Sequence, residues 1–512
     1  MADEPSSVAG APAAAVAGAP GDVTGIPATD ADGHGGVAGA RRIAANSVIQ
    51  AGGEAGSKVA MLVLYAVMAR ELGQQDFGDF TSAASLALLV LVAGFGVDFT
   101  TTKLVARGDV AAGDAFRDSV TTKVGLGVLV IAAVVGVAAI GGYDRQVVIG
   151  TALLGLATLI ELVTMSVHAV LRGVERTGPI AQGQLLQRSA TAFLGIAALT
   201  QGAGLVVVAL IWIACATIGL LFTLSRALRI GAVPHGRRSA AGARAVLRDS
   251  FGLGLSSVFG AALSRLDVII LGLLQPATAV ALYGASYRLF ESCLFVVATF
   301  AFAAFPMLSR IGPDDRAAMG VAYGRVLKVL VVTTAPMVLA LTLFADPIIE
   351  LVYGPQYVDA VSGLQLLAPA ILFTGAFTMT CNVLAALGRQ RAVVAGLLVG
   401  AACNAGLNLA LVPPHAEDGA ALAMSLSMAL TAGLLFVLAR RATGPVLVVR
   451  ATAGPLVASA AAVAAVLALG DALAVLPVAM AVYAGVLVLA ERSLFPADFR
   501  AVRQVLVRRS VS

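Results

Sequence analysis

The residues most suited to chemistry lie in the stretch LSRLDVIILGLL, residues 263–274, where two charges interrupt an apolar run. Arg265 and Asp267 are two positions apart, and side chains at that spacing on a helix point to different faces. They therefore cannot neutralise each other within one helix. If the run crosses a membrane, a charge near its centre costs roughly 2.5–3.5 kcal/mol even on the more permissive insertion scale. Each charge then needs a partner on another helix, in water or on a ligand.

Two other apolar stretches each carry a cation close to an acid. Glu54 lies four residues before Lys58, a spacing at which helical side chains meet. Arg288 lies three residues before Glu291, which also brings the two side chains together. Both pairs can form ion pairs within their own helix, which is the purely structural interpretation. The alternative, which we favour, is a polar cavity for transport, with cations from Lys58, Arg265 and Arg288.

Polar stripes run along the same two stretches. In the first, residues at intervals of four share one helical face: Asn46, Gln50, Glu54 and Lys58. In the second, the same spacing joins Tyr283, Tyr287 and Glu291. Three weaker candidates lie in other apolar segments: Asp98, Glu161 and His168. His168 follows Glu161 by two helical turns, so the two could relay protons, although a lone histidine near a helix end more often only packs.

The composition shows what kind of element must position these residues. Of the 512 residues, 59% are apolar and 12% are charged, and the mean hydropathy is +0.93. A soluble domain carries about twice that charged fraction, so this chain cannot cover several soluble domain surfaces with polar groups. We therefore predict an all-α polytopic membrane protein.

Fourteen apolar segments are each about 20 residues or longer, enough to cross a hydrocarbon core of about 30 Å. Their approximate cores are 43–69, 80–101, 120–141, 147–171, 180–200, 204–228, 250–273, 279–304, 321–345, 360–387, 391–411, 418–439, 451–469 and 472–490.

The basic residues set the orientation of these spans. With the N-terminus in the cytoplasm, only Arg70 and Arg145 fall outside, and four cations lie within spans: Lys58, Arg188, Arg265 and Arg288. All other lysines and arginines lie in or beside cytoplasmic segments. We therefore predict that both chain ends are cytoplasmic.

The basic stretch RALRIGAVPHGRRSAAGARAVLRDS, residues 226–250, divides the first twelve spans into six and six. Weak echoes relate the halves: FGDF opens the second span and YGASY the eighth, while VLRGVERT leaves the fourth and VLAALGRQ the tenth. We predict two pseudo-symmetric six-helix lobes plus two C-terminal helices, with the functional site between the lobes.

The predicted organisation follows from these boundaries. It comprises a disordered cytoplasmic tail (1–40), an N-lobe (41–229), a basic cytoplasmic linker (230–249), a C-lobe (250–440), the two C-terminal helices (441–491) and a basic cytoplasmic tail (492–512). Residues 499–512 of the last tail either form an interfacial helix on anionic lipid or only fix the topology.

Motifs of catalysis are missing from the sequence. It has no P-loop, no zinc-ligand spacing and no nucleophile elbow, and the four cysteines lie singly in apolar segments. The longest loop predicted outside is only Ala345–Ala360. We therefore expect no enzyme activity, no metal or other cofactor, and no nucleotide or nucleic acid partner. Transport would be coupled to an ion gradient, H⁺ or Na⁺, or to the substrate's own gradient.

Several stretches together carry a family resemblance. They are ARELGQQDFGDFTSAASLALLVLVAGFGVD, LRGVERTGPIAQ, SRLDVIILGLLQPATAVALYGASYRLFE, FADPIIELVYGPQYVDAVSGLQLLAPA, LAALGRQR and NLALVPPHAEDGAALA. In order and spacing, over about residues 41–492, they resemble bacterial polysaccharide flippases of the Wzx type in the multidrug/oligosaccharidyl-lipid/polysaccharide (MOP) exporter superfamily. The chain departs from that pattern at HAEDGAA, where the family usually has YG..GAA, and in its acidic N-terminal tail.

The resemblance implies two lobes that open alternately inward and outward around a cavity lined by spans 1, 2, 7 and 8. The substrate it implies is a polyprenyl-diphosphate-linked oligosaccharide, moved from the inner to the outer leaflet of the bacterial cytoplasmic membrane. Arg265, Arg288 and Lys58 would bind the diphosphate by charge-assisted hydrogen bonds. Coupling H⁺ or Na⁺ would bind one of three acids: Glu54, Asp267 or Glu291. Membrane lipids and polysaccharide polymerase and assembly proteins would be further partners.

Three other functions compete with this one. An ion-coupled exporter of small cations, similar to MATE transporters, would need an acid-dominated cavity, whereas acids and cations are balanced here. A lipid II flippase is a further relative in the same superfamily. A membrane glycan polymerase or ligase would need a substantial outer loop, and the predicted outer loops are short.

Overall fold

The computed structural model shows a chain of helices joined by short connections. It describes residues 35–94, 96–108, 110–232, 248, 250, 265–311, 315–446 and 448–495, with side chains described from residue 56 onward except those of Phe302 and Pro306. Three predictions therefore lie largely outside the described residues: the disordered tail, the basic linker and the interfacial helix at 499–512. The side chains of Asn46, Gln50 and Glu54 also lie outside them.

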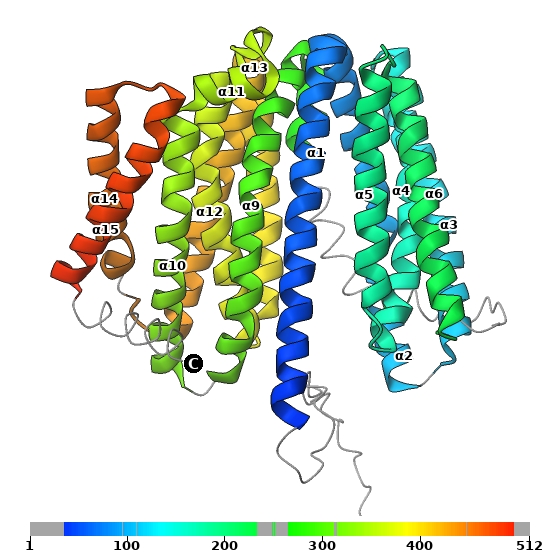
Figure 1. Ribbon diagram of the computed structural model, residues 1–512, viewed down its shortest axis with the longest axis horizontal. Helices are drawn as coiled ribbons and strands as arrows, with labels where there is room; N and C mark the ends of the chain where they lie inside the picture. The colour runs from blue at the N-terminus through cyan, green and yellow to red at the C-terminus, as the bar shows by residue number, and fades with distance from the viewer. Residues whose placement is uncertain are drawn as a thin grey trace, which may run out of the picture. The chain divides into compact units, whose positions relative to one another are not determined.

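The helices of the first half of the chain are α1 (Gly35–Leu88), η1 (Leu89–Gly94), α2 (Val97–Arg107), α3 (Ala112–Ile140), α4 (Arg145–Gly173), α5 (Gly178–Leu199) and α6 (Leu205–Arg229) (Figure 1). Those of the second half are α8 (Leu266–Leu274), α9 (Ala277–Ile311), α10 (Arg316–Leu343), α11 (Ala345–Tyr353), η2 (Pro355–Tyr357), α12 (Ala360–Ala386) and α13 (Gln390–Thr443). Then follow α14 (Val448–Leu469), η3 (Leu473–Val475) and α15 (Leu476–Leu494). Helix α1 begins at Gly35, within the predicted tail of residues 1–40, and the boundary of that tail stays a prediction.

Among the described residues, ten helical segments are long and apolar enough to cross a membrane. Large apolar side chains such as Leu129, Phe193 and Leu467 are exposed on the helices. Contiguous exposed apolar faces of this kind are unfavourable in water, whereas lipid solvates them. The chain is therefore an all-α polytopic membrane protein.

Two of the ten segments are long enough for two crossings each. Gly56–Arg107 has 52 residues and Gln390–Thr443 has 54. At 1.5 Å per residue, each segment corresponds to about 80 Å of helix. The backbone breaks at Gly73 (φ 72°) and at Ala416 (φ 43°), each between two spans predicted from the sequence. The predicted fifth span, α5, is not among the ten, and most of the seventh lies outside the described residues. The total of fourteen spans stays a prediction.

The described helices pack in two groups. In the first, α2, α3 and α6 lie against α4, and α5 lies against α6. In the second, α9, α10 and α13 pack on α12, α8 lies against α13, and α14 joins α10 to α15 (Figure 1). Near its kink, α1 contacts the second group, because Arg70 Nε donates to the carbonyl of Val352 at 3.0 Å and the Tyr357 hydroxyl donates to the carbonyl of Ala69 at 3.2 Å. The predicted lobe boundaries and the pseudo-symmetry remain predictions.

Candidate functional site

Two predicted substrate-binding arginines share one carboxylate. Arg288 Nη1 lies 2.8 Å from Glu291 Oε2, one turn along α9, and Arg265 Nη2 lies 3.4 Å from Glu291 Oε1. Arg265 precedes α8, so the partner that it needs comes from another helix. The two arginine side chains are each 13% exposed and the Glu291 side chain is 37% exposed. Two cations against one acid leave a net positive charge in a largely desolvated place.

All three predicted substrate-binding cations lie over aromatic rings. The Arg288 guanidinium carbon is 3.9 Å from the ring centroid of Tyr65 on α1, and that of Arg265 is 5.4 Å from the centroid of Tyr287. Lys58 Nζ lies 5.3 Å from the centroid of Phe295 on α9. A ring face attracts a cation without cancelling its charge. The rings therefore hold these cations in place and leave them able to bind an anion.

Asp267 is buried and accepts its side-chain hydrogen bond from a tyrosine. The residue is 2% exposed. Its Oδ2 accepts a hydrogen bond from the hydroxyl of Tyr283, while Oδ1 is buried with no hydrogen-bond partner among the described residues. A buried carboxylate oxygen without a partner is unfavourable unless a proton, a cation or water satisfies it.

A cavity of about 220 Å³ joins residues of both groups of helices. Arg265 and Arg288 line it from α8 and α9, Tyr65 from α1, Glu161 from α4 and Trp212 from α6. Trp212, the single tryptophan of the chain, was missed by the sequence reasoning. Its uniqueness in an apolar segment was the available signal.

Three aromatic side chains of the lining lie close together and form an aromatic wall: Tyr65, Phe80 and Trp212. The ring centroids of Tyr65 and Phe80 are 6.3 Å apart, and those of Phe80 and Trp212 are 5.6 Å apart. Glu161 Oε1 accepts a hydrogen bond of 2.8 Å from Gln187 Nε2 of α5. Neither Lys58 nor Asp267 is among the described residues that line this cavity.

Two of the weaker candidates lie elsewhere. Asp98 forms an ion pair with Lys123 of α3. The sequence had placed Lys123 at the cytoplasmic end of its predicted span. Lys123 is fully buried, and its Nζ also donates to the carbonyl of Leu162 at 3.0 Å. His168 is buried, and its Nε2 has no hydrogen-bond partner among the described residues. The hydrogen-bond partner described for Glu161 is Gln187, so the geometry adds no support to a relay with His168.

Comparison with known families decides what kind of protein carries this site. The sequence profile of the family described as "Polysaccharide biosynthesis protein" matches residues 43–312, more than half of the chain. The chain belongs to this family. A second profile, MatE, matches residues 253–410 of this polysaccharide biosynthesis protein. This family is one of multi-pass transporters, so the chain is a transporter and not an enzyme.

Individual relatives agree with the family. The chain is 24% identical over 367 residues to "Probable low-salt glycan biosynthesis flippase Agl15" of Haloferax volcanii, covering 70% of this chain and 76% of that one. A structure of lipid II flippase MurJ in an inward closed conformation has a TM-score of 0.72 at 12% identity, covering 88% of this chain and 99% of that one. An inward-facing multidrug resistance MATE family transporter of the MOP superfamily has a TM-score of 0.64 at 16% identity, covering 75% and 94%. The last two similarities establish the shared fold.

Proposed function

We propose that this transporter flips a polyprenyl-diphosphate-linked oligosaccharide from the inner to the outer leaflet of the cell membrane. The observation that carries the proposal is the pair Arg265 and Arg288, which face one cavity and share Glu291. The planar fork of a guanidinium matches two phosphate oxygens at once. The glycan flippase named among the relatives supports a lipid-linked glycan as the substrate class.

Glu291 would alternate with the diphosphate as the partner of the two arginines. On the outward step the diphosphate oxygens would accept hydrogen bonds from Arg265 and Arg288. On the return step the cavity is empty of substrate, and two unpaired guanidinium groups in a low dielectric would be costly. Glu291 would then hold both, as it does here, and the unpartnered Oδ1 of Asp267 would bind the coupling proton or Na⁺.

The aromatic wall would accept the sugars. Sugar rings have apolar faces that pack on flat side chains such as Tyr65, Phe80 and Trp212, which line the cavity. Its volume of about 220 Å³ equals roughly seven water molecules at about 30 Å³ each. That is too small for a diphosphate with several sugars, so the helices must separate to admit the substrate. The polyprenyl chain would stay in lipid between them.

The test compares charge-neutral variants in reconstituted vesicles. Arg265→Gln and Arg288→Gln should each slow the flipping of a fluorescent polyprenyl-diphosphate oligosaccharide by about tenfold or more, because a hydrogen bond to a charged group contributes about 1.5–3 kcal/mol. Lys58→Gln should slow it less, since Lys58 does not line the cavity. Arg226→Gln is the matched control: its guanidinium also lies over a ring, 5.3 Å from the centroid of Phe222, but outside the cavity.

The outcomes separate the candidate functions. Normal flipping by Arg265→Gln, Arg288→Gln and Lys58→Gln, in folded protein, contradicts the cationic cavity. Flipping of lipid II with no movement of the oligosaccharide lipid would identify a lipid II flippase. Efflux of organic cations alone would identify a MATE-like exporter.

A further inference from the structure

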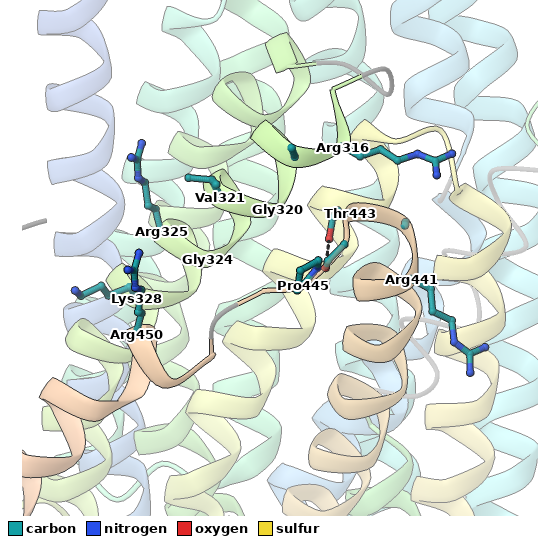
Figure 2. Close-up of a pocket in the computed structure, with 13 residues that line it drawn as sticks. Arg316, Gly320, Val321, Gly324, Arg325, Lys328, Arg441, Thr443, Pro445 and Arg450 are labelled. Carbon is teal, nitrogen blue, oxygen red and sulfur yellow. Dashed lines mark hydrogen bonds between the residues drawn. The ribbon is translucent and has the colours of Figure 1, made fainter. Parts of the chain in front are cut away.

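A second basic cavity lies where the chain passes from α13 to α14. It has a volume of about 610 Å³, and its walls come from α10, the end of α13 and the start of α14 (Figure 2). The described residues that line it include no acid and five cations: Arg316, Arg325, Lys328, Arg441 and Arg450. None of these residues lines the cavity that holds Arg265 and Arg288. The two basic sites are therefore separate.

Two glycines shape the backbone beside this cavity. Helix α13 ends at Thr443, and Gly444 turns the chain with a left-handed φ of 86° that favours glycine. The turn runs beside α10 at Gly320, where an added Cβ would lie 3.0 Å from the carbonyl oxygen of Thr443. At both points a larger residue would strain the turn or push it from α10.

The cations of the cavity differ in how far they are neutralised. Lys328 Nζ lies 2.5 Å from Glu491 Oε2 of α15 and 4.6 Å from the ring centroid of Phe495. Arg325 and Arg450 are exposed, and within the described part of the chain neither has an ion-pair partner. In the view of Figure 2, Arg325, Lys328 and Arg450 lie on one side of the cavity. Several cations that outnumber their acids attract an anion.

Arg316 and Arg441 line the same cavity but are placed differently. In Figure 2 both side chains extend away from the side on which Arg325 and Arg450 lie. They have the same charge and are also exposed. A matched comparison for any effect of net charge alone is Arg389 with Arg391, which are exposed and line neither cavity.

An apolar groove adjoins the basic cavity. It has a volume of about 660 Å³ and runs between α9 and α10, with Phe300, Met307 and Val329 among its lining residues. Val321 and Arg325 line both the groove and the basic cavity, and Arg325 is the only charged residue among the described residues of the groove. A ligand that fills both must be apolar along one part and anionic at the end next to Arg325.

We propose that the basic cavity and the α9–α10 groove together bind one anionic phospholipid of the surrounding bilayer. The phosphate would lie against Arg325, Lys328 and Arg450, and an acyl chain would lie in the groove. Guanidinium groups bind phosphate oxygens in pairs, and basic pockets between transmembrane helices suit anionic headgroups. A free phosphate would leave the groove empty, which is why a lipid fits better. The proposal does not depend on which substrate the transporter moves.

The test is native mass spectrometry of the full chain in detergent, titrated with phosphatidylglycerol or with phosphatidylcholine of the same chains. Wild-type protein should bind phosphatidylglycerol more tightly. Neutralising Arg325 and Arg450 together, as Arg325→Gln with Arg450→Gln, should weaken that binding roughly thirty-fold, since each basic residue near a lipid headgroup is worth about a factor of five. The pair Arg389→Gln with Arg391→Gln, which lies at the start of α13 and outside both cavities, should change it less than about twofold.

A second variant tests the junction of the two cavities. Val321 lines the basic cavity near the start of α10 beside several cations, so Val321→Asp should fold, and its carboxylate would repel the phosphate. It should weaken phosphatidylglycerol binding at least as much as losing one arginine does. Equal binding of the two lipids by wild-type protein, or equal loss in both arginine pairs, would overturn the proposal. So would tighter binding of a polyprenyl diphosphate that the Arg325 and Arg450 changes abolish, because the occupant would then be the transport substrate.

Discussion

At the scale of single residues, two groups of ion-paired side chains in the described part of the chain differ in their surroundings. Arg265, Arg288 and Glu291 line or adjoin a cavity and are partly exposed, so a ligand can exchange with the carboxylate. Lys123 is fully enclosed beside Asp98, and nothing but the protein can satisfy it. The first arrangement suits binding and release, while the second ties α2 to α3.

We expect the pair of Lys123 and Asp98 to be structural. Lys123→Met should lower the free energy of unfolding by about 3 kcal/mol, the low end for breaking a buried pair because the Asp98 side chain is 21% exposed. Asp98→Asn in the same chain should restore most of that loss, since neither charge is then unpaired. Denaturant unfolding in detergent micelles measures both effects.

Lys103→Met is the control for this pair, because Lys103 is an exposed lysine on the neighbouring α2 and should change the unfolding free energy little. If Asp98→Asn fails to rescue Lys123→Met while unfolding stays two-state, the pair is not the source of the loss.

At the scale of elements, close contacts near the kink of α1 hold it to the second group of helices. Arg70 donates to the carbonyls of Leu351 and Val352, which end α11 where the helix dipole is negative. Gln74 donates to the carbonyl of Gln356. At Gly78 the approach of α1 to the start of α9 is so close that an added Cβ would overlap the carbonyl oxygen of Ala277.

Gly78→Ala should therefore disfavour the helix arrangement seen here. The overlapping atom belongs to the backbone and cannot rotate away, so α1 must move from α9. We expect less disulfide crosslinking between Gln74→Cys and Gln356→Cys, and slower transport. Gly136→Ala is the matched control, since the added Cβ on α3 meets no atom within 4 Å. Unchanged crosslinking in Gly78→Ala would show that this contact does not hold the arrangement.

The sequence predicted the helices better than the side-chain contacts between them. The lengths of the apolar segments predicted two spans within each of the two longest helices. The backbone breaks between those spans, at Gly73 and at Ala416. The sequence also predicted that Arg265 needs a partner beyond Asp267. It could not identify that partner as Glu291, or place Lys123 beside Asp98, because such contacts depend on how helices pack rather than on spacing along one helix.

At the scale of the whole molecule, the two basic cavities described above differ in burial and in the side chains around them. Arg265 and Arg288 are mostly buried beside a small cavity, where the low dielectric strengthens each interaction. Arg325 and Arg450 are exposed, and Arg325 also lines the apolar groove. One site suits a ligand that enters and leaves, and the other suits a lipid that stays at the surface.

The charges of the connections between helices predict the orientation of the chain in the membrane. The last turn of α4 and the connection to α5 carry Arg172, Glu175 and Arg176, whereas the connection between α5 and α6, TQGAG, carries no charge. Moving one positive charge outward against the membrane potential costs about 2.3 kcal/mol per 100 mV, so the basic connection should stay in the cytoplasm.

Cysteine labelling in whole cells tests this orientation. In a chain whose four native cysteines are replaced by alanine, Gln201→Cys should react with a membrane-impermeant maleimide added outside, because it lies on the exposed turn between α5 and α6. Thr177→Cys, which is also exposed but sits beside the arginines, should react only after the cells are permeabilised. Since α5 alone separates the two positions, they must label from opposite sides if it spans the membrane. The reverse pattern would invert the predicted topology, and labelling of both from outside would remove α5 from the set of spans.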